Sequence, residues 1–146
     1  INIQGGDDMP TAQKSLRVPE NILKEIDKIA KEAKKDFTAV TNELLEEAIK
    51  VHRCPGIVFT EGTSGKRARV AGTGIEVWEI IATYKSVAND FKRLSKAYSW
   101  LTVQQLKSAI GYYRLYTKEI DDLIAENESW TPEKIRGKYP FLSEGS

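Results

Sequence analysis

The chain has 146 residues, of which 40% are hydrophobic and 29% charged, a composition typical of a globular protein with one domain or two small ones. It holds one cysteine and one histidine, which excludes an internal disulfide, a zinc site built from several Cys and His residues, and catalysis by paired histidines. No apolar run is long enough for a bilayer or resembles a signal peptide, so we expect a cytoplasmic protein without a membrane partner.

The net charge of +1 hides an uneven distribution. Residues 1–53 carry nine basic and ten acidic side chains, whereas residues 64–118 carry ten basic and three acidic ones. A basic middle segment favours an acidic partner, either nucleic acid or an acidic protein surface. A solvated charged face would give the same composition, so charge alone does not choose between them.

The N-terminal third predicts a strand followed by two helices. Residues 1–11 are rich in Gly and Asp, which is typical of a disordered arm. In residues 13–18 polar and apolar positions alternate, so a short strand is expected, and Pro19 ends it. Apolar residues at three- and four-residue spacing then predict helices over 20–34 and from Thr38, as N-cap, to about His52.

One strand and two helices cannot pair the backbone of the strand or cover its apolar side. The economical solution is a second copy of the chain, with two antiparallel strands above four helices. Residues 12–54 are therefore expected to form a homodimeric domain.

The rest of the chain predicts a small β-hairpin and several helices. Strands are expected over 57–59 and 66–70, followed by helices over 76–87 and 90–98. A single long helix is expected from the Thr102 cap to about Asn127, with Val103 at the start of a stripe spaced like a coiled-coil seam. We expect residues 55–128 to form one mostly helical domain and residues 129–146 a helical tail.

A two-stranded ribbon has the right width for the major groove of DNA. Gln13, Ser15 and Arg17 share one face of the predicted strand, and all three are residue types that read base edges. The backbone N–H groups of Ala39 and Val40, with the hydroxyl of Thr38, would form an anion site for a DNA phosphate at the start of the second helix. The alternative is an ordinary solvent-facing strand.

Residues 12–53 resemble a ribbon-helix-helix domain of the Arc/MetJ/CopG class. The matching positions are Arg17-Val18-Pro19 at the end of the strand, with Thr38 and Glu43-Leu44 at the start of the second helix. The resemblance implies a mostly α fold: a dimer that binds double-stranded operator DNA through its ribbon.

Residues 57–118 are similar to the DUF433 family, whose members have a helix-turn-helix-like fold. The similarity is carried by Gly65-Lys66, Gly72-Thr73, Ile75, Val77, and Tyr98 with Leu101-Thr102. A ribbon-helix-helix domain joined to such a domain resembles a VapB-like antitoxin. The resemblance implies repression of the protein's own operon and neutralisation of a PIN-type RNase toxin, with neither catalysis nor a cofactor in this chain.

Two segments are candidate toxin-binding sites. The tail holds three aromatic residues around one arginine, namely Trp130, Arg136, Tyr139 and Phe141. A guanidinium pairs well with carboxylates such as those that hold the metal of a PIN nuclease, although the tail would also serve to close its own domain. The competing basic face lies on the expected helix over 90–98 and consists of Lys92, Arg93 and Lys96.

The main alternative is a ribbon-helix-helix transcriptional regulator without a toxin, whose second domain senses a ligand or reads more DNA. A PIN-like gene beside that of this chain would favour the antitoxin. A phosphate loop at Gly62–Lys66 is not favoured, because Arg67 stands where such loops need Ser or Thr.

Overall fold

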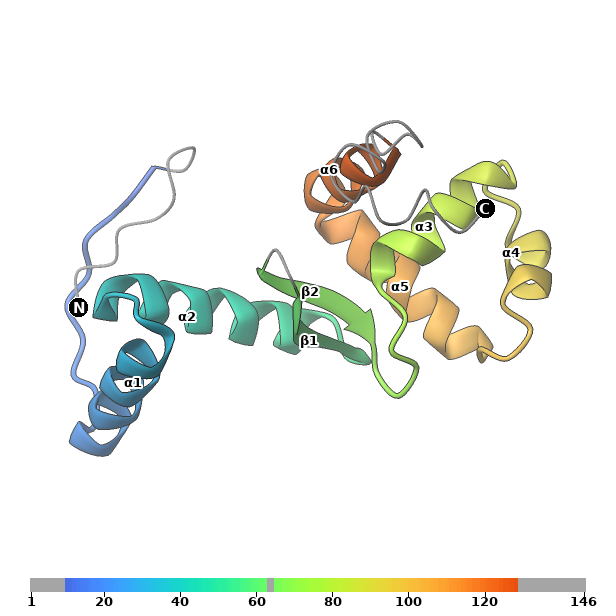
Figure 1. Cartoon of the computed structure of the whole chain (residues 1–146). Coiled ribbons are helices and arrows are strands. Elements are labelled where there is room, and N and C mark those ends of the chain that lie inside the picture. Colours follow the sequence, from blue (N-terminus) through green and yellow to red (C-terminus); the bar gives the residue numbers. More distant parts are fainter. Residues whose placement is uncertain (1–9, 63–64, 129–146) are drawn as a thin grey trace, which may run out of the picture. The chain divides into compact units, whose positions relative to one another are not determined.

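The computed structural model describes residues 10–62 and 65–128, which fold as two compact units (Figure 1). The N-terminal unit ends at Arg53 and the C-terminal unit begins at Cys54. The predicted boundary lay one residue later. The observed boundary lies before Cys54 because the Cys54 side chain is buried in the core of the C-terminal unit.

Two helices, α1 (Glu20–Ala33) and α2 (Phe37–Arg53), make up the N-terminal unit (Figure 1). Both predicted helices are confirmed. The turn between them begins at Lys34, which adopts the left-handed conformation with φ 55°. The N–H of Lys35 then donates to the carbonyl of Ala30, 3.0 Å away, which closes the end of α1.

The start of α2 differs from the prediction. Asp36, not Thr38, caps this helix: its Oδ1 accepts a hydrogen bond from the N–H of Ala39 at 2.7 Å. The helix therefore begins at Phe37, one residue before the predicted cap. Aspartate is at least as good a cap as threonine, and its negative charge is also favourable at the positive end of a helix.

Residues 10–19 have no regular secondary structure, so the strand predicted over 13–18 is not found in the single chain. The physical reason is that a strand needs a neighbour to pair its backbone, and the described part of the chain provides none there. Among the described residues 10–53, the core between the two helices consists of Ile26, Ala30 and Val40, with the partly buried Phe37 and Leu44 packed against it.

The C-terminal unit opens with the predicted hairpin. Strand β1 (Ile57–Gly62) pairs antiparallel with β2 (Gly65–Val70), and Ile57 lies opposite Val70. Both strands are slightly longer than expected. Every second residue faces the core, so Ile57 and Val70 are buried while Val58 is exposed.

Between the hairpin and residue 128 the structure describes four helices: α3 (Val77–Ser86), α4 (Phe91–Ala97), α5 (Val103–Leu115) and α6 (Thr117–Glu128). The described chain is thus mostly helical with one small hairpin, as predicted. The expected capping box at the start of α5 is confirmed, because Thr102 and Gln105 bond reciprocally to each other's backbone N–H.

The single long helix predicted from Thr102 to Asn127 is wrong. It breaks at Tyr116, whose φ of −125° and ψ of 49° are not helical, and the chain continues as α6. The hydroxyl of Thr117 donates to the carbonyl of Tyr113 at 2.7 Å, a bond of the kind that bends helices. After the break α6 packs against α3 as well as α5, which a continuous seam would not allow.

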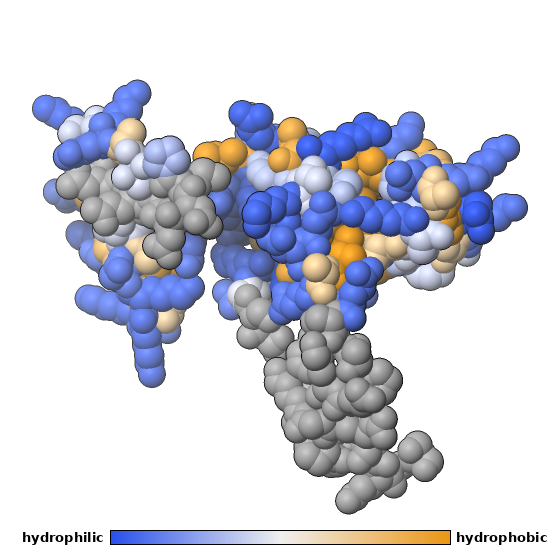
Figure 2. Space-filling model, turned by 90° about the horizontal axis from the view of Figure 1, so that it is seen from above, coloured by the Kyte–Doolittle hydropathy of each residue, from blue (hydrophilic) through white to orange (hydrophobic). Residues whose placement is uncertain are grey.

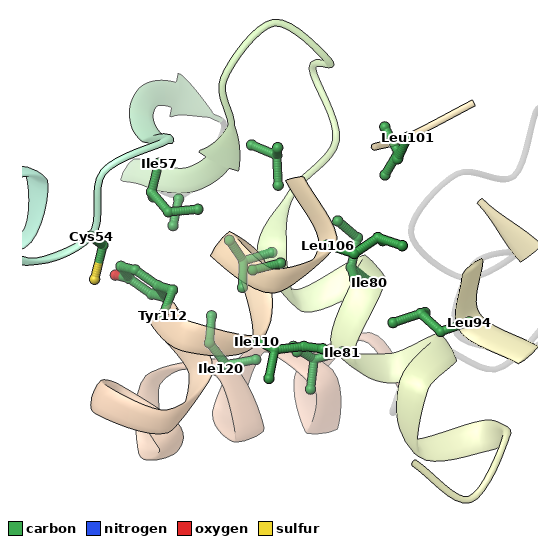
Figure 3. Packing of buried hydrophobic residues seen from close by; sticks show 14 of the residues in the cluster. Cys54, Ile57, Ile80, Ile81, Leu94, Leu101, Leu106, Ile110, Tyr112 and Ile120 are labelled. Atoms are coloured by element: carbon green, nitrogen blue, oxygen red, sulfur yellow. The ribbon is translucent and has the colours of Figure 1, made fainter. Parts of the chain in front are cut away.

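The core of this unit gathers side chains from all of its elements (Figure 3). The hairpin contributes Ile57, α3 contributes Ile80 and Ile81, and α4 contributes Leu94. Leu106 and Tyr112 come from α5, and Ile120 from α6. This core is far larger than that of the N-terminal unit, so the C-terminal unit has the means to fold by itself.

Candidate DNA-binding and partner-binding surfaces

The predicted base-reading residues lie before α1, where Gln13, Ser15 and Arg17 are all exposed. Leu16, expected on the opposite and apolar side, is 53% exposed too. The single chain therefore presents the three polar side chains to solvent but does not fix them on one face of a strand.

In the predicted phosphate site at Thr38, Ala39 and Val40, the two backbone donors bond to Asp36. The N–H of Ala39 donates to the side chain of Asp36, and the N–H of Val40 donates to the Asp36 carbonyl at 3.1 Å. Both donors that a phosphate would need are taken, and the nearby carboxylate would repel it. The predicted site assumed that Thr38, not Asp36, caps the helix.

The two helices of the N-terminal unit leave several large hydrophobic side chains exposed. Ile22 and Ile29 on α1 are 45% and 39% exposed, while Leu45 and Ile49 on α2 are 45% and 54% exposed. Hydrophobic residues also reach the visible surface among the hydrophilic ones in Figure 2. An apolar area of this kind, beside a three-residue core, is typical of a surface that meets a partner.

On α4, the predicted basic residues Lys92, Arg93 and Lys96 are all exposed. The opposite side of this helix buries Leu94 in the core, which fixes the basic side toward solvent. The cap of the helix is Asp90, whose carboxylate accepts from the N–H of Arg93 at 3.3 Å. Between residues 91 and 116 there are five basic and no acidic residues.

Two hydrophobic residues that follow α4 in the chain are exposed, and their exposure was not predicted. Trp100, in the turn between α4 and α5, is 68% exposed, and Val103 at the start of α5 is 51% exposed. Val103 was expected in the apolar stripe, which is a correction. The sequence did indicate this exposure, because a cap at Thr102 makes Val103 the first residue of the helix, where a side chain has fewer helical neighbours.

A polar cluster joins α3, α5 and α6 at the surface. Lys85 lies 2.7 Å and the hydroxyl of Tyr113 2.8 Å from Oδ1 of Asp121. The hydrogen bond from Lys85, and then that from Tyr113, lowers the pKa of Asp121, while the same bond to Asp121 raises the pKa of Lys85. The positive charge of Lys85 is balanced by the negative charge of Asp121 within the cluster. The cluster therefore serves to hold the three helices together.

Within the described residues, no group of three or more His, Cys, Asp or Glu side chains is placed to bind a metal. A surface hollow on α1 is lined by charged residues alone, namely Lys24, Glu25, Asp27, Lys28 and Lys31. Its lining fits a solvated helix face. No helix in the described parts of the chain has both the length and the apolar character needed to cross a bilayer.

The predicted toxin-binding residues of the tail, Trp130, Arg136, Tyr139 and Phe141, lie outside the described residues. Of the two candidate toxin-binding segments, the structure thus describes only α4.

No family model matches the chain, and no curated protein matches it. Among solved structures, the chain is similar to a DUF433 member protein from Anabaena variabilis, known from a crystal structure. The two are 30% identical over 60% of this chain and 83% of that protein, with a TM-score of 0.42. The chain belongs to the DUF433 family, which confirms the resemblance seen in its C-terminal half.

Proposed function

We propose that this chain is the antitoxin of a type II toxin-antitoxin module. Its N-terminal unit forms a homodimer that binds operator DNA and represses its own operon, and its C-terminal unit binds and neutralises a PIN-type RNase. The observation that carries the proposal is the exposed apolar surface of α1 and α2 next to the exposed residues Gln13, Ser15 and Arg17.

The dimer follows from the apolar surface. Fully burying one exposed Ile or Leu side chain stabilises a protein by about 1.5–3 kcal/mol, and four such residues lie uncovered on the two helices: Ile22, Ile29, Leu45 and Ile49. A two-fold symmetric pair is the commonest way for a chain to cover a surface of its own. In that pair, residues 13–18 of the two copies supply the partner strand that each copy lacks.

DNA binding follows from what the paired strands would present. Their polar face carries two copies each of Gln13, Ser15 and Arg17, and a two-stranded ribbon enters the major groove. Arginine reads guanine, glutamine reads adenine, and serine accepts or donates to either. Lysine side chains would contact the DNA phosphates, because the N–H donor of Ala39 at the start of α2 already bonds to Asp36.

The RNase partner is supported by the separate core and the basic surface of the C-terminal unit. Three basic side chains of α4 are exposed to solvent, namely Lys92, Arg93 and Lys96. No acidic residue lies between residues 91 and 116. As the VapB-like resemblance implies, PIN-type RNases gather carboxylates around a metal ion, which makes them acidic partners. Trp130, Arg136, Tyr139 and Phe141 remain a proposed second contact.

The test uses the full chain with the RNase encoded beside it. RNA cleavage is measured as the chain is added, and binding to the DNA upstream of its own gene is measured by fluorescence anisotropy. We expect stoichiometric loss of cleavage and salt-dependent DNA binding. A chain that binds the DNA but leaves cleavage unchanged would instead be a regulator without a toxin, and this proposal would be wrong.

A further inference from the structure

We propose that the turn between α4 and α5 is the centre of the toxin-binding surface, with Trp100 and Val103 buried in the partner and with exposed lysines on the two helices that the turn joins. This inference rests on the proposed function, and it names the contact surface that the function requires. The occupant is an acidic protein surface with an apolar depression, here that of the RNase.

Trp100 is held in place although it is exposed. Its ring meets that of Tyr98 edge to face, with the ring centres 5.5 Å apart and the planes at 61°. Tyr98 is itself fixed to α3, because its hydroxyl lies 3.4 Å from the carbonyl oxygen of Glu79 and 3.3 Å from the hydroxyl of Thr83. A side chain that is already ordered loses little conformational entropy on binding, which favours its use as an anchor.

The charged residues from 91 to 116 are all basic, and the nearest acidic residue in the chain is Asp90, whose carboxylate caps α4. Lys92 and Lys96 lie four residues apart and share a side of α4, and Lys107 lies four residues after Val103 on α5. All three lysines are exposed, and no acidic residue lies between 91 and 116 to neutralise them. The surface thus has an apolar centre and a basic edge, an arrangement that protein interfaces favour.

The apolar centre favours a protein over DNA as the occupant. Four large hydrophobic residues of the described C-terminal unit are exposed, and two of them, Trp100 and Val103, lie three positions apart in this one turn. Surfaces that bind DNA backbones are polar and positively charged, whereas tryptophan is enriched among the residues that carry protein-protein binding energy.

The experiment measures association and dissociation rates of the full chain with the purified RNase. Trp100→Ala is expected to weaken binding roughly tenfold or more, mainly through faster dissociation. The double variant Lys92→Glu/Lys96→Glu is expected to slow association and to reduce its dependence on salt. The two kinds of substitution therefore report on the apolar centre and the basic edge separately.

Matched controls come from the same chain. Leu115→Ala removes a side chain that is 53% exposed at the other end of α5, and Lys24→Glu/Lys28→Glu repeats the charge change on α1. Both controls should bind like the original chain.

If the original chain binds the RNase and Trp100→Ala binds equally well, the inference is wrong and the proposed function stands. If the original chain does not bind the RNase, both are wrong. If Trp100→Ala weakens binding to a DNA duplex and not to the RNase, DNA is the occupant and the inference is wrong.

Discussion

The hydroxyl of Tyr112 donates a 2.6 Å hydrogen bond to Oε2 of Glu119, across the break between α5 and α6. Tyr112 is fully buried, and its ring also lies 4.8 Å from that of Tyr116, the residue at which the helix breaks. One side chain of the core therefore joins α5 to the first turn of α6 across the break. The bond adds to the packing of α6 against α3 in holding the bend.

Loss of this bond should destabilise the C-terminal unit. A hydrogen bond to a charged group contributes about 1.5–3 kcal/mol, so we expect Tyr112→Phe to lower the free energy of unfolding by that amount. Tyr113→Phe is the matched control, because its hydroxyl bonds to Asp121 at the surface. The control should change stability by less than about 1 kcal/mol, as exposed polar contacts do. Urea unfolding measures both, and equal effects would contradict the role given to Tyr112.

The same tyrosine predicts a response to alkaline pH. Burial, and then the hydrogen bond to Glu119, raises the pKa of Tyr112 above its ordinary value of 10.0. The folded state thus favours the neutral phenol, so the stabilising effect is complete below pH 10 and is lost as the pH rises above it. The difference in stability between the original chain and Tyr112→Phe should shrink above pH 10. A difference that stays constant from pH 8 to pH 11 would contradict this.

Gly56 should tolerate no side chain. Its φ of +91° is unfavourable for other residues, and an added Cβ would lie 2.9 Å from the hydroxyl of Ser108 on α5. We expect Gly56→Ala to cost about 1–2 kcal/mol for the backbone, and more because the Ser108 hydroxyl must leave its bond to Gln104. Gly72→Ala, with φ +78° and open space around it, isolates the backbone effect. Thermal unfolding should rank Gly56→Ala below Gly72→Ala, and Ser108→Ala in addition should remove the difference.

Arg17 carries the prediction for DNA. If it reads a guanine in the operator, Arg17→Ala should weaken binding by about 1–3 kcal/mol and relax the preference at one symmetric base position. Lys28→Ala, an exposed change on α1, should leave that preference intact. Anisotropy with operator duplexes at one salt concentration measures both. Unchanged preference in Arg17→Ala would remove the base-reading role.

Where local patterns decide the structure, they could be read from the sequence. The stripe containing Ile26 and Ala30 predicted α1, and the Thr102–Gln105 pair predicted the start of α5. Both features depend only on residues within a few positions of each other. The DUF433 likeness was also visible in short motifs of the C-terminal half.

Where local signals compete, the sequence was not enough. Asp36 and Thr38 are both good caps, and their order of preference depends on the turn at Lys34, which no pattern indicated. The break at Tyr116 arises because Ile120 and Ile124 pack beside α3, a contact distant in sequence. The predicted strand over 13–18 depends on another chain, and so a single chain cannot display it.

The three-residue core of the N-terminal unit has a consequence for how long the protein persists in a cell. A unit held together by Ile26, Ala30 and Val40 opens easily when it is alone, and open segments are the ones that proteases cut. Pairing with a second copy, as proposed, would protect it by mass action. The abundance of the chain would then set its own rate of degradation: scarce copies would be cleared quickly, and plentiful ones would survive.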